Sequence, residues 1–141
     1  MTDPDAALSY RKLMVPVDMR HRENSAKSIE TAAALAASSG GEFLIMTAAN
    51  PLGKHLTDSP ESDEKAFRSW IEELSHRYGR PITPIFRSHE SPEWAILQEC
   101  RERGVDLVVM ASHDPRLADH IFGSHASHIV RHAPCSVLVM R

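Results

Sequence analysis

Short runs of apolar residues recur along this chain, and a longer amphipathic segment separates each run from the next. An unbroken apolar run is typical of a strand buried on both faces of a sheet, whereas an apolar stripe every three or four residues is typical of a helix lying on that sheet. The alternation therefore predicts an α/β fold, a doubly wound five-stranded parallel sheet. The expected strands are residues 12–18, 43–48, 82–87, 106–111 and 136–140.

Capping residues set the expected limits of the helices, which are residues 25–39, 60–78, 91–104 and 123–132. Asn24 or Ser25 can cap the first helix, and Ser91 is followed by a proline and an acid, which is a typical helix start. Glycines stop the first three helices. Two prolines fall inside expected strands. Pro16 is tolerable if pairing stops there, and Pro84 places the third strand near an edge.

The apolar stripes predict which helical residues face the sheet. In the second helix they are Phe67, Ile71, Leu74 and Tyr78. In the third they include Trp94 and Leu97, and in the last Ile129, Val130 and Ala133.

The 141 residues suit one domain, expected at residues 9–141 after a loose tail at 1–8. A net charge of −3 argues against nucleic acid as the main partner. No apolar run reaches the length of a membrane span and no secretory signal opens the chain, so we expect a cytoplasmic protein and no membrane partner. Cys100 and Cys135 lie in apolar stretches and are interpreted as buried reduced thiols, with a disulfide or a reactive thiol as the alternatives.

Chemistry is expected at the carboxyl ends of the strands, where a doubly wound sheet binds its ligands. The first strand ends in Asp18, which can hydrogen-bond a ribose or an adenine edge. Gly123 and Ser124 open the last helix, whose N-terminus can hold an anion. The alternatives are that Asp18 caps the following segment and that Gly123 and Ser124 only make a turn and a cap.

The enzyme motifs common in this architecture are missing from the sequence. It contains no P-loop, no Gly-x-Gly-x-x-Gly and no Gly-x-Ser-x-Gly elbow. His128 and His132 have a metal-compatible spacing, but a cation near a helix C-terminus is the stronger interpretation, and we expect no metal site. A binding protein is therefore favoured over an enzyme.

Three segments of the chain resemble the universal stress protein family. They are residues 13–18, residues 104–110 and, most specifically, the ending from Gly123 and Ser124 through residues 129–139. The resemblance implies a Rossmann-like sheet of the adenine nucleotide alpha hydrolase type with the strand order 3-2-1-4-5. It also implies a homodimer joined through the last strand, at Val137, Leu138, Val139 and Met140. Many members bind ATP and act in the stress response.

Carried over by position, the resemblance implies a site for ATP or AMP, with Mg²⁺ accompanying the nucleotide. Pro16, Val17 and Asp18 would border the adenosine, and the backbone of Ala48 would meet the adenine. The residues on the ribose and phosphate side would be Met110, Ala111 and His113. The residues cradling the phosphates would be Gly123, Ser124, His125 and Ala126.

The chain departs from the ATP-binding motif of the family at two glycines, which are Ala111 and Asp114 here, and eight residues rather than nine precede Gly123. A bacterial subgroup with a Ser-His-x-Pro loop before Gly-Ser is nevertheless similar to residues 112–115 and 123–127. We therefore expect an adenine-nucleotide-binding regulatory protein. The alternatives are a dimeric interaction module that has lost nucleotide binding, and a slow ATPase or self-phosphorylating protein.

Overall fold

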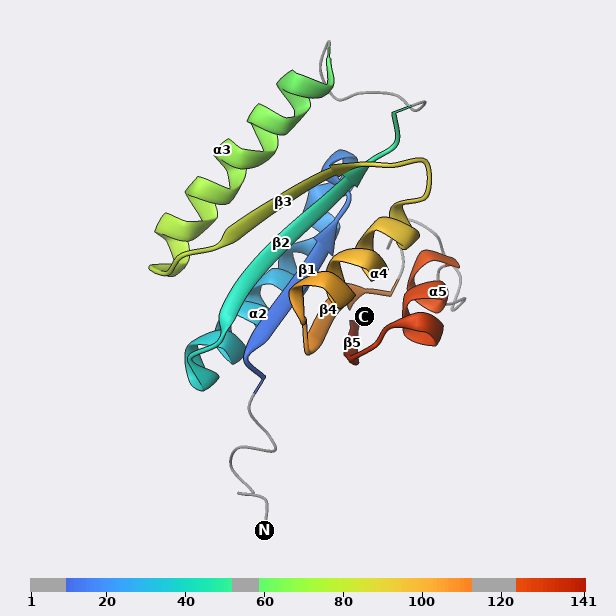
Figure 1. Cartoon of the computed structure of the whole chain (residues 1–141). Helices are drawn as coiled ribbons and strands as arrows, with labels where there is room; N and C mark the ends of the chain where they lie inside the picture. Colours follow the sequence, from blue (N-terminus) through green and yellow to red (C-terminus); the bar gives the residue numbers. More distant parts are fainter. Residues whose placement is uncertain (1–9, 52–58, 113–123) are drawn as a thin grey trace.

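The computed structural model describes residues 10–51, 59–112 and 124–141, so the expected tail at residues 1–8 lies outside the described part. Five parallel strands form one sheet in the order β3-β2-β1-β4-β5 (Figure 1). The predicted fold class and strand order are thus confirmed. The strands are β1 (Lys12–Val17), β2 (Glu42–Ala49), β3 (Thr83–Ser88), β4 (Leu107–Ala111) and β5 (Ser136–Met140).

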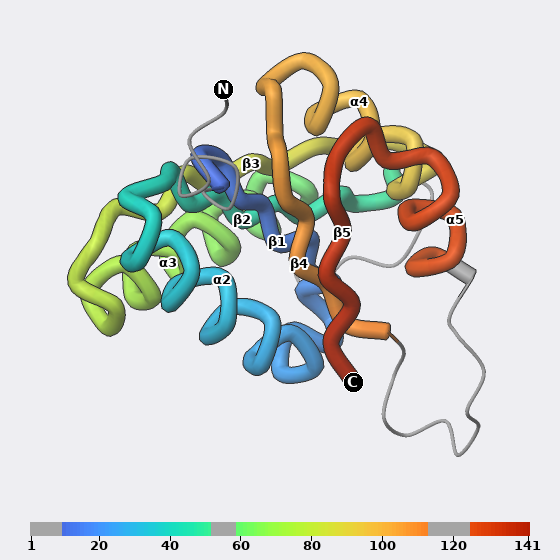
Figure 2. Tube along the Cα trace, turned by 90° about the horizontal axis from the view of Figure 1, so that it is seen from below, coloured from blue at the N-terminus to red at the C-terminus, as the bar shows by residue number. Residues whose placement is uncertain are grey.

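Helices cover both faces of this sheet. Helices α2 and α3 pack on one face and α4 and α5 on the other, and the view from below shows these two layers on either side of the sheet (Figure 2). The helices are α2 (Ala26–Ser39), α3 (Pro60–Tyr78), α4 (Pro92–Arg103) and α5 (Ser124–His132), and a 3₁₀ segment, η1 (Met19–Ser25), precedes α2. A right-handed crossover between parallel strands places its connecting helix on one face of the sheet. Because the strand order runs one way from β1 to β3 and the other way from β4 to β5, the helices of the two halves lie on opposite faces.

Alternate residues of the central strands enter two separate apolar clusters. In β1, Leu13 and Val15 pack with α2 and α3, whereas Met14 packs with α4 and α5. In β4, Val109 packs with α2 and α3, and Val108 packs with α4 and α5. Because neither face meets solvent, both sets must be apolar, which explains why the strands appear in the sequence as unbroken apolar runs.

The two strand prolines behave differently from each other. Pairing of β1 with β4 stops at Met14, before Pro16, but pairing with β2 continues through Pro16 to Val17. The expectation for Pro16 is therefore confirmed on one side and wrong on the other. Pro84 lies in the edge strand β3, as predicted.

The first helix begins within one residue of its predicted start, but the segment before it differs from the prediction. Residues 19–25 form the 3₁₀ segment η1, which the sequence pattern did not indicate. Ser25 occupies the N-cap position of α2, but its side chain makes no capping hydrogen bond. By contrast, the Ser91 hydroxyl accepts a hydrogen bond from the Trp94 N–H at 3.3 Å, so the predicted cap of α4 is confirmed.

Two residues assigned to buried helical faces are exposed. Trp94 in α4 is 45% exposed and Val130 in α5 is 46% exposed. Their helices are short and contact the sheet through other residues, Leu97 and Ile129, which are buried. The predicted face of α3 is buried at Phe67, Ile71 and Leu74, because a longer stripe defines its direction better.

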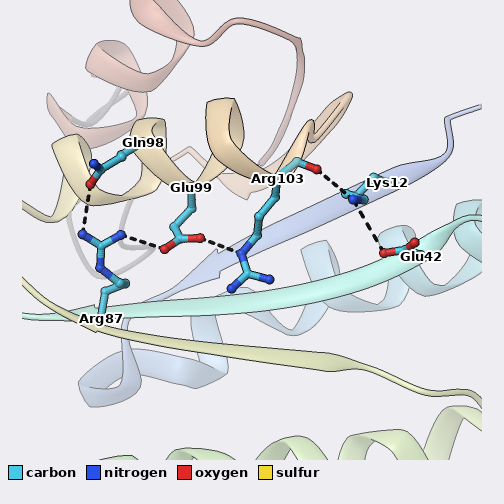
Figure 3. A network of polar contacts seen from close by, with 6 residues as sticks. All are labelled: Lys12, Glu42, Arg87, Gln98, Glu99 and Arg103. Carbon is cyan, nitrogen blue, oxygen red and sulfur yellow. Dashed lines mark hydrogen bonds and ion pairs between the residues drawn. The ribbon is translucent and has the colours of Figure 1, made fainter.

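A nearly buried carboxylate fixes α4 to the sheet. Glu99, whose side chain is 8% exposed, accepts hydrogen bonds from Arg87 of β3 at 2.7 Å and from Arg103 at 2.6 Å (Figure 3). Gln98 accepts a further hydrogen bond from Arg87 at 3.0 Å. Lys12 of β1 donates to the Arg103 carbonyl at 2.7 Å. The network therefore connects α4 to both β3 and β1.

Two serines of α2 differ in their hydrogen bonds, and replacing each by alanine should have opposite effects on stability. Ser28 is fully buried and its hydroxyl makes no hydrogen bond to any described residue, whereas the Ser39 hydroxyl donates to the Tyr10 carbonyl at 2.7 Å and accepts from the Gly41 N–H at 3.2 Å. We expect Ser28→Ala to leave the free energy of unfolding unchanged or to raise it by up to about 1 kcal/mol, because it removes an unpaired polar group. Ser39→Ala should lower it by about 1 kcal/mol. Urea unfolding of both variants checks this, and a clear loss for Ser28→Ala would contradict it.

Candidate functional site

The carboxyl ends of β1 and β4 lie side by side at the centre of the sheet. The chain leaves β1 toward β2 on one side, and β4 returns on the other side, so the strand order reverses between them. The connecting helices on the two sides of such a reversal lie on opposite faces of the sheet, and doubly wound proteins bind ligands outside the carboxyl ends of the strands at this point. The sequence-predicted residues at these two strand ends are Pro16, Val17, Met110 and Ala111.

Asp18 follows β1 directly and has a defined set of partners. Its carboxylate accepts a hydrogen bond from the Arg20 N–H at 3.0 Å and lies 3.3 Å from the Arg20 guanidinium. Half burial would raise the pKa of Asp18, but the hydrogen bonds and charge of Arg20, with a smaller effect of His21, hold that pKa below its ordinary value. Asp18 is thus a charged cap of η1, as the alternative interpretation has it, while 49% of its side chain stays open to solvent.

The backbone around the two strand ends is firmly held. The Val17 carbonyl accepts a hydrogen bond from the buried Thr47 hydroxyl at 3.0 Å. The Ser112 N–H donates to the Met140 carbonyl at 2.9 Å, which ties the end of β4 to the end of β5. Ala48 lies one residue beyond the last β1–β2 pair and is opposite Arg87 of β3. This side of the site therefore consists of fixed backbone.

The start of α5 faces the start of α4. Ser124 is the first residue of α5, Ala126 is buried in the apolar cluster under the helix, and the exposed His125 forms an ion pair with Glu93 when its ring is protonated. Partial burial would raise the pKa of Glu93, but the backbone N–H of the helix start and His125 outweigh it and lower that pKa. The backbone at the start of α4 and the His125 ring of α5 thus both contact the Glu93 carboxylate.

The sequence analysis did not include three further groups that lie near the carboxyl ends of the strands. Arg20 gave a weak signal because it lies two residues after Asp18. Glu93 gave none, because its contact with His125 joins distant segments. The ring of His89 stacks on Trp94 with centroids 4.5 Å apart, and the His89 N–H donates to the Ala49 carbonyl at 2.9 Å, so this aromatic pair lies against the end of β2.

Three residues of the predicted loop and helix start fall in the undescribed range. His113, Gly123 and Asp114 lie outside the described residues, and so does the side chain of Ser124. Within the described ranges, no three His, Cys, Asp or Glu side chains are grouped so that they could hold a metal ion. In the same part of the chain, no helix is long and apolar enough to cross a membrane.

Comparison with known proteins gives relatives of similar length. Universal stress protein G of Salmonella typhimurium is 30% identical over 94% of this chain and 99% of its own length. Two solved structures share the fold at lower identity. A universal stress protein in complex with cAMP is 20% identical with a TM-score of 0.70, covering 94% of this chain and 98% of its own. The universal stress protein from Archaeoglobus fulgidus in complex with dAMP is 18% identical with a TM-score of 0.68, covering 95% and 100%.

A family model covers almost the entire chain. The model of the universal stress protein family matches residues 9–141, a range that includes all the strands and helices of the described residues. The relatives that match over nearly their whole length carry the same family name. The chain belongs to the universal stress protein family.

Proposed function

We propose that this protein is a regulatory member of its family that binds an adenine nucleotide, ATP or AMP, at the carboxyl ends of β1 and β4. The observation that carries the proposal is the reversal of strand order between these ends, with Asp18 on one side and the N-terminus of α5 on the other. The solved relatives in complex with cAMP and dAMP support an adenine ligand. His113 and Gly123 remain predictions from the sequence.

Each part of the site suits a different part of the ligand. The half-exposed carboxylate of Asp18 can accept hydrogen bonds from ribose hydroxyls, and the backbone near Ala48 can pair with the adenine edge. The first N–H groups of α5 can donate to phosphates, and the dipole of the helix favours the negative charge there. Among the residues described, no pairing of a base with an orienting group and a nucleophile suggests catalysis, so we propose binding without turnover.

Isothermal titration calorimetry with ATP, AMP and GTP tests the proposal. We expect saturable heat with one adenine nucleotide per chain and weaker binding of GTP, because the adenine edge is read by fixed backbone groups. Absence of saturable heat with both ATP and AMP would contradict the proposal.

Glu93 should tune the preference between the two nucleotides. Its carboxylate lies beside the start of α5, where the phosphates are proposed to bind, and it repels them. We expect Glu93→Gln to strengthen ATP binding by about two- to fivefold and AMP binding by less, because ATP carries more negative charge. Glu102→Gln, at the opposite end of α4, is the control. Equal effects of the two variants on ATP affinity would show that only net charge matters.

The second candidate function is a dimeric module that binds no nucleotide. It is favoured by Ala111, which stands where ATP-binding members have a glycine. Both candidates share the proposed homodimer, since β5 is an edge strand with Leu138 37% exposed. A protein that is dimeric in solution and gives no binding heat on titration with ATP or AMP would favour this second function.

A charge on the edge strand should separate the protomers. We expect wild type to sediment as a dimer and Leu138→Glu to sediment as a monomer, because a buried unpaired carboxylate opposes association. Ser69→Glu, on the exposed face of α3, is the control and should remain dimeric. Monomeric wild type at all protein concentrations would contradict dimerisation through β5.

A further inference from the structure

The fold brings the only two cysteines of the chain together. Cys100 lies near the end of α4, and the Val105 N–H donates to its carbonyl at 3.0 Å as the chain returns toward β4. The register of β4 and β5 pairs Leu107 with Ser136, so Cys135 lies beside Asp106, just before both strands begin. Backbone connection and strand register therefore converge on the same end of the sheet.

The two thiols differ in access and in chemistry. Cys100 is 1% exposed, whereas Cys135 is partly buried and packs against the apolar cluster that contains Cys100. The contact with Cys135 raises the pKa of Cys100, and burial raises it further. The same contact lowers the pKa of Cys135 although burial opposes it. Cys135 is thus the more accessible of the two thiols, and Cys100 is buried next to it.

We propose that Cys135 and Cys100 form a peroxide-sensitive pair that closes an intramolecular disulfide. In the first step the Cys135 thiolate attacks one oxygen of hydrogen peroxide, which gives a sulfenic acid at Cys135 and releases hydroxide. In the second step the sulfur of Cys100 attacks the Cys135 sulfur, loses its proton and displaces water. Two sulfurs are oxidised by one electron each, and the peroxide accepts both electrons.

The disulfide would join the end of α4 to the segment that precedes β5. This is the amino end of the strands, opposite to the carboxyl end where Asp18 lies. The pair is therefore independent of the proposed nucleotide site, and its oxidation can be followed without any ligand. A cross-link between two ordered elements restricts the unfolded chain, so the oxidised protein should unfold at a higher temperature than the reduced protein.

Intact mass spectrometry of the full chain after treatment with hydrogen peroxide tests the proposal. We expect a monomeric product that is lighter by two hydrogens, does not react with N-ethylmaleimide and returns to its original mass with dithiothreitol. Its peptide map should contain Cys100 linked to Cys135, and its Tm should rise until the reductant is added.

Two variants separate the roles of the cysteines. In Cys100→Ala, Cys135 should stop at a sulfenic acid that dimedone traps, whereas in Cys135→Ala the buried Cys100 should resist peroxide. The wild-type result stands alone if either variant fails to fold. Wild type that gains oxygen without losing two hydrogens, that keeps both thiols, or that forms only disulfides between chains would overturn the proposal.

Discussion

Replacing Asp18 by alanine is expected to lower the affinity for ATP and AMP by about ten- to a hundredfold, the usual effect of losing hydrogen bonds to a charged acceptor. The direction is informative because simple electrostatics predicts the opposite. Removing a carboxylate near a phosphate ligand should strengthen binding unless that carboxylate accepts hydrogen bonds from the ligand. Titration calorimetry of the variant against wild type measures the change.

Two further variants isolate the hydrogen bonds from the structural role of Asp18. The carboxylate also caps η1, so Asp18→Ala should lower the free energy of unfolding by about 1 kcal/mol. Asp18→Asn keeps both a cap and an acceptor oxygen, and its affinity should fall less. Glu102→Ala removes a carboxylate far from the site and should not weaken binding. Affinity for ATP that is unchanged or higher in Asp18→Ala would contradict the role given to this residue.

Replacing Glu99 by glutamine should lower the free energy of unfolding at neutral pH by about 2–3 kcal/mol. The variant leaves Arg87 and Arg103 without the carboxylate that both of them contact, and loss of one partner in a buried ion pair costs several kcal/mol. We expect less than the full effect because the Arg87 and Arg103 side chains are 28% and 41% exposed and can be partly hydrated. Urea unfolding measures the difference.

The effect of Glu99 should also depend on pH. Burial would raise the pKa of Glu99, but the hydrogen bonds and charges of Arg103 and Arg87 hold it below the ordinary value of 4.5. The unfolded chain therefore binds the proton first as pH falls, and the stabilisation is complete above 4.5 and decreases below it. The difference in free energy of unfolding between wild type and Glu99→Gln should be constant from neutral pH to about 5 and should decrease at lower pH.

The exposed pair between Glu64 and Arg68 provides the matched control. These residues are four positions apart on α3, with 3.1 Å between the Arg68 Nε and the carboxylate, and about half of each side chain is exposed. Glu64→Gln should change the free energy of unfolding by less than about 0.5 kcal/mol. A loss for Glu99→Gln no larger than this would show that the network does not hold α4 to the sheet.

Much of the fold could be predicted because its signals are local. Unbroken apolar runs placed the five strands, and the stripe of Phe67, Ile71 and Leu74 placed the face of α3. The 3₁₀ segment η1 was missed because no periodicity of three marks its residues. Trp94 and Val130 were assigned to buried faces because a short helix offers too few residues to define its direction.

The candidate site was predictable only where its residues end a strand or start a helix. Asp18, directly after β1, and His125, at the start of α5, were proposed in this way, and the structure places His125 against Glu93 at the start of α4. The partners that set their charge environment were not predicted. The pairing of Glu93 with His125 depends on how α4 and α5 pack, which the sequence near either residue does not encode.

The central claim is that an adenine nucleotide binds between the ends of β1 and β4, and ATP titration followed by amide NMR shifts tests it most directly. We predict that the largest shifts fall on Val17, Asp18, Ala111 and the first residues of α5, with little change along α3. Absence of shifts under saturating ATP, or shifts confined to residues distant from these strand ends, would contradict the claim.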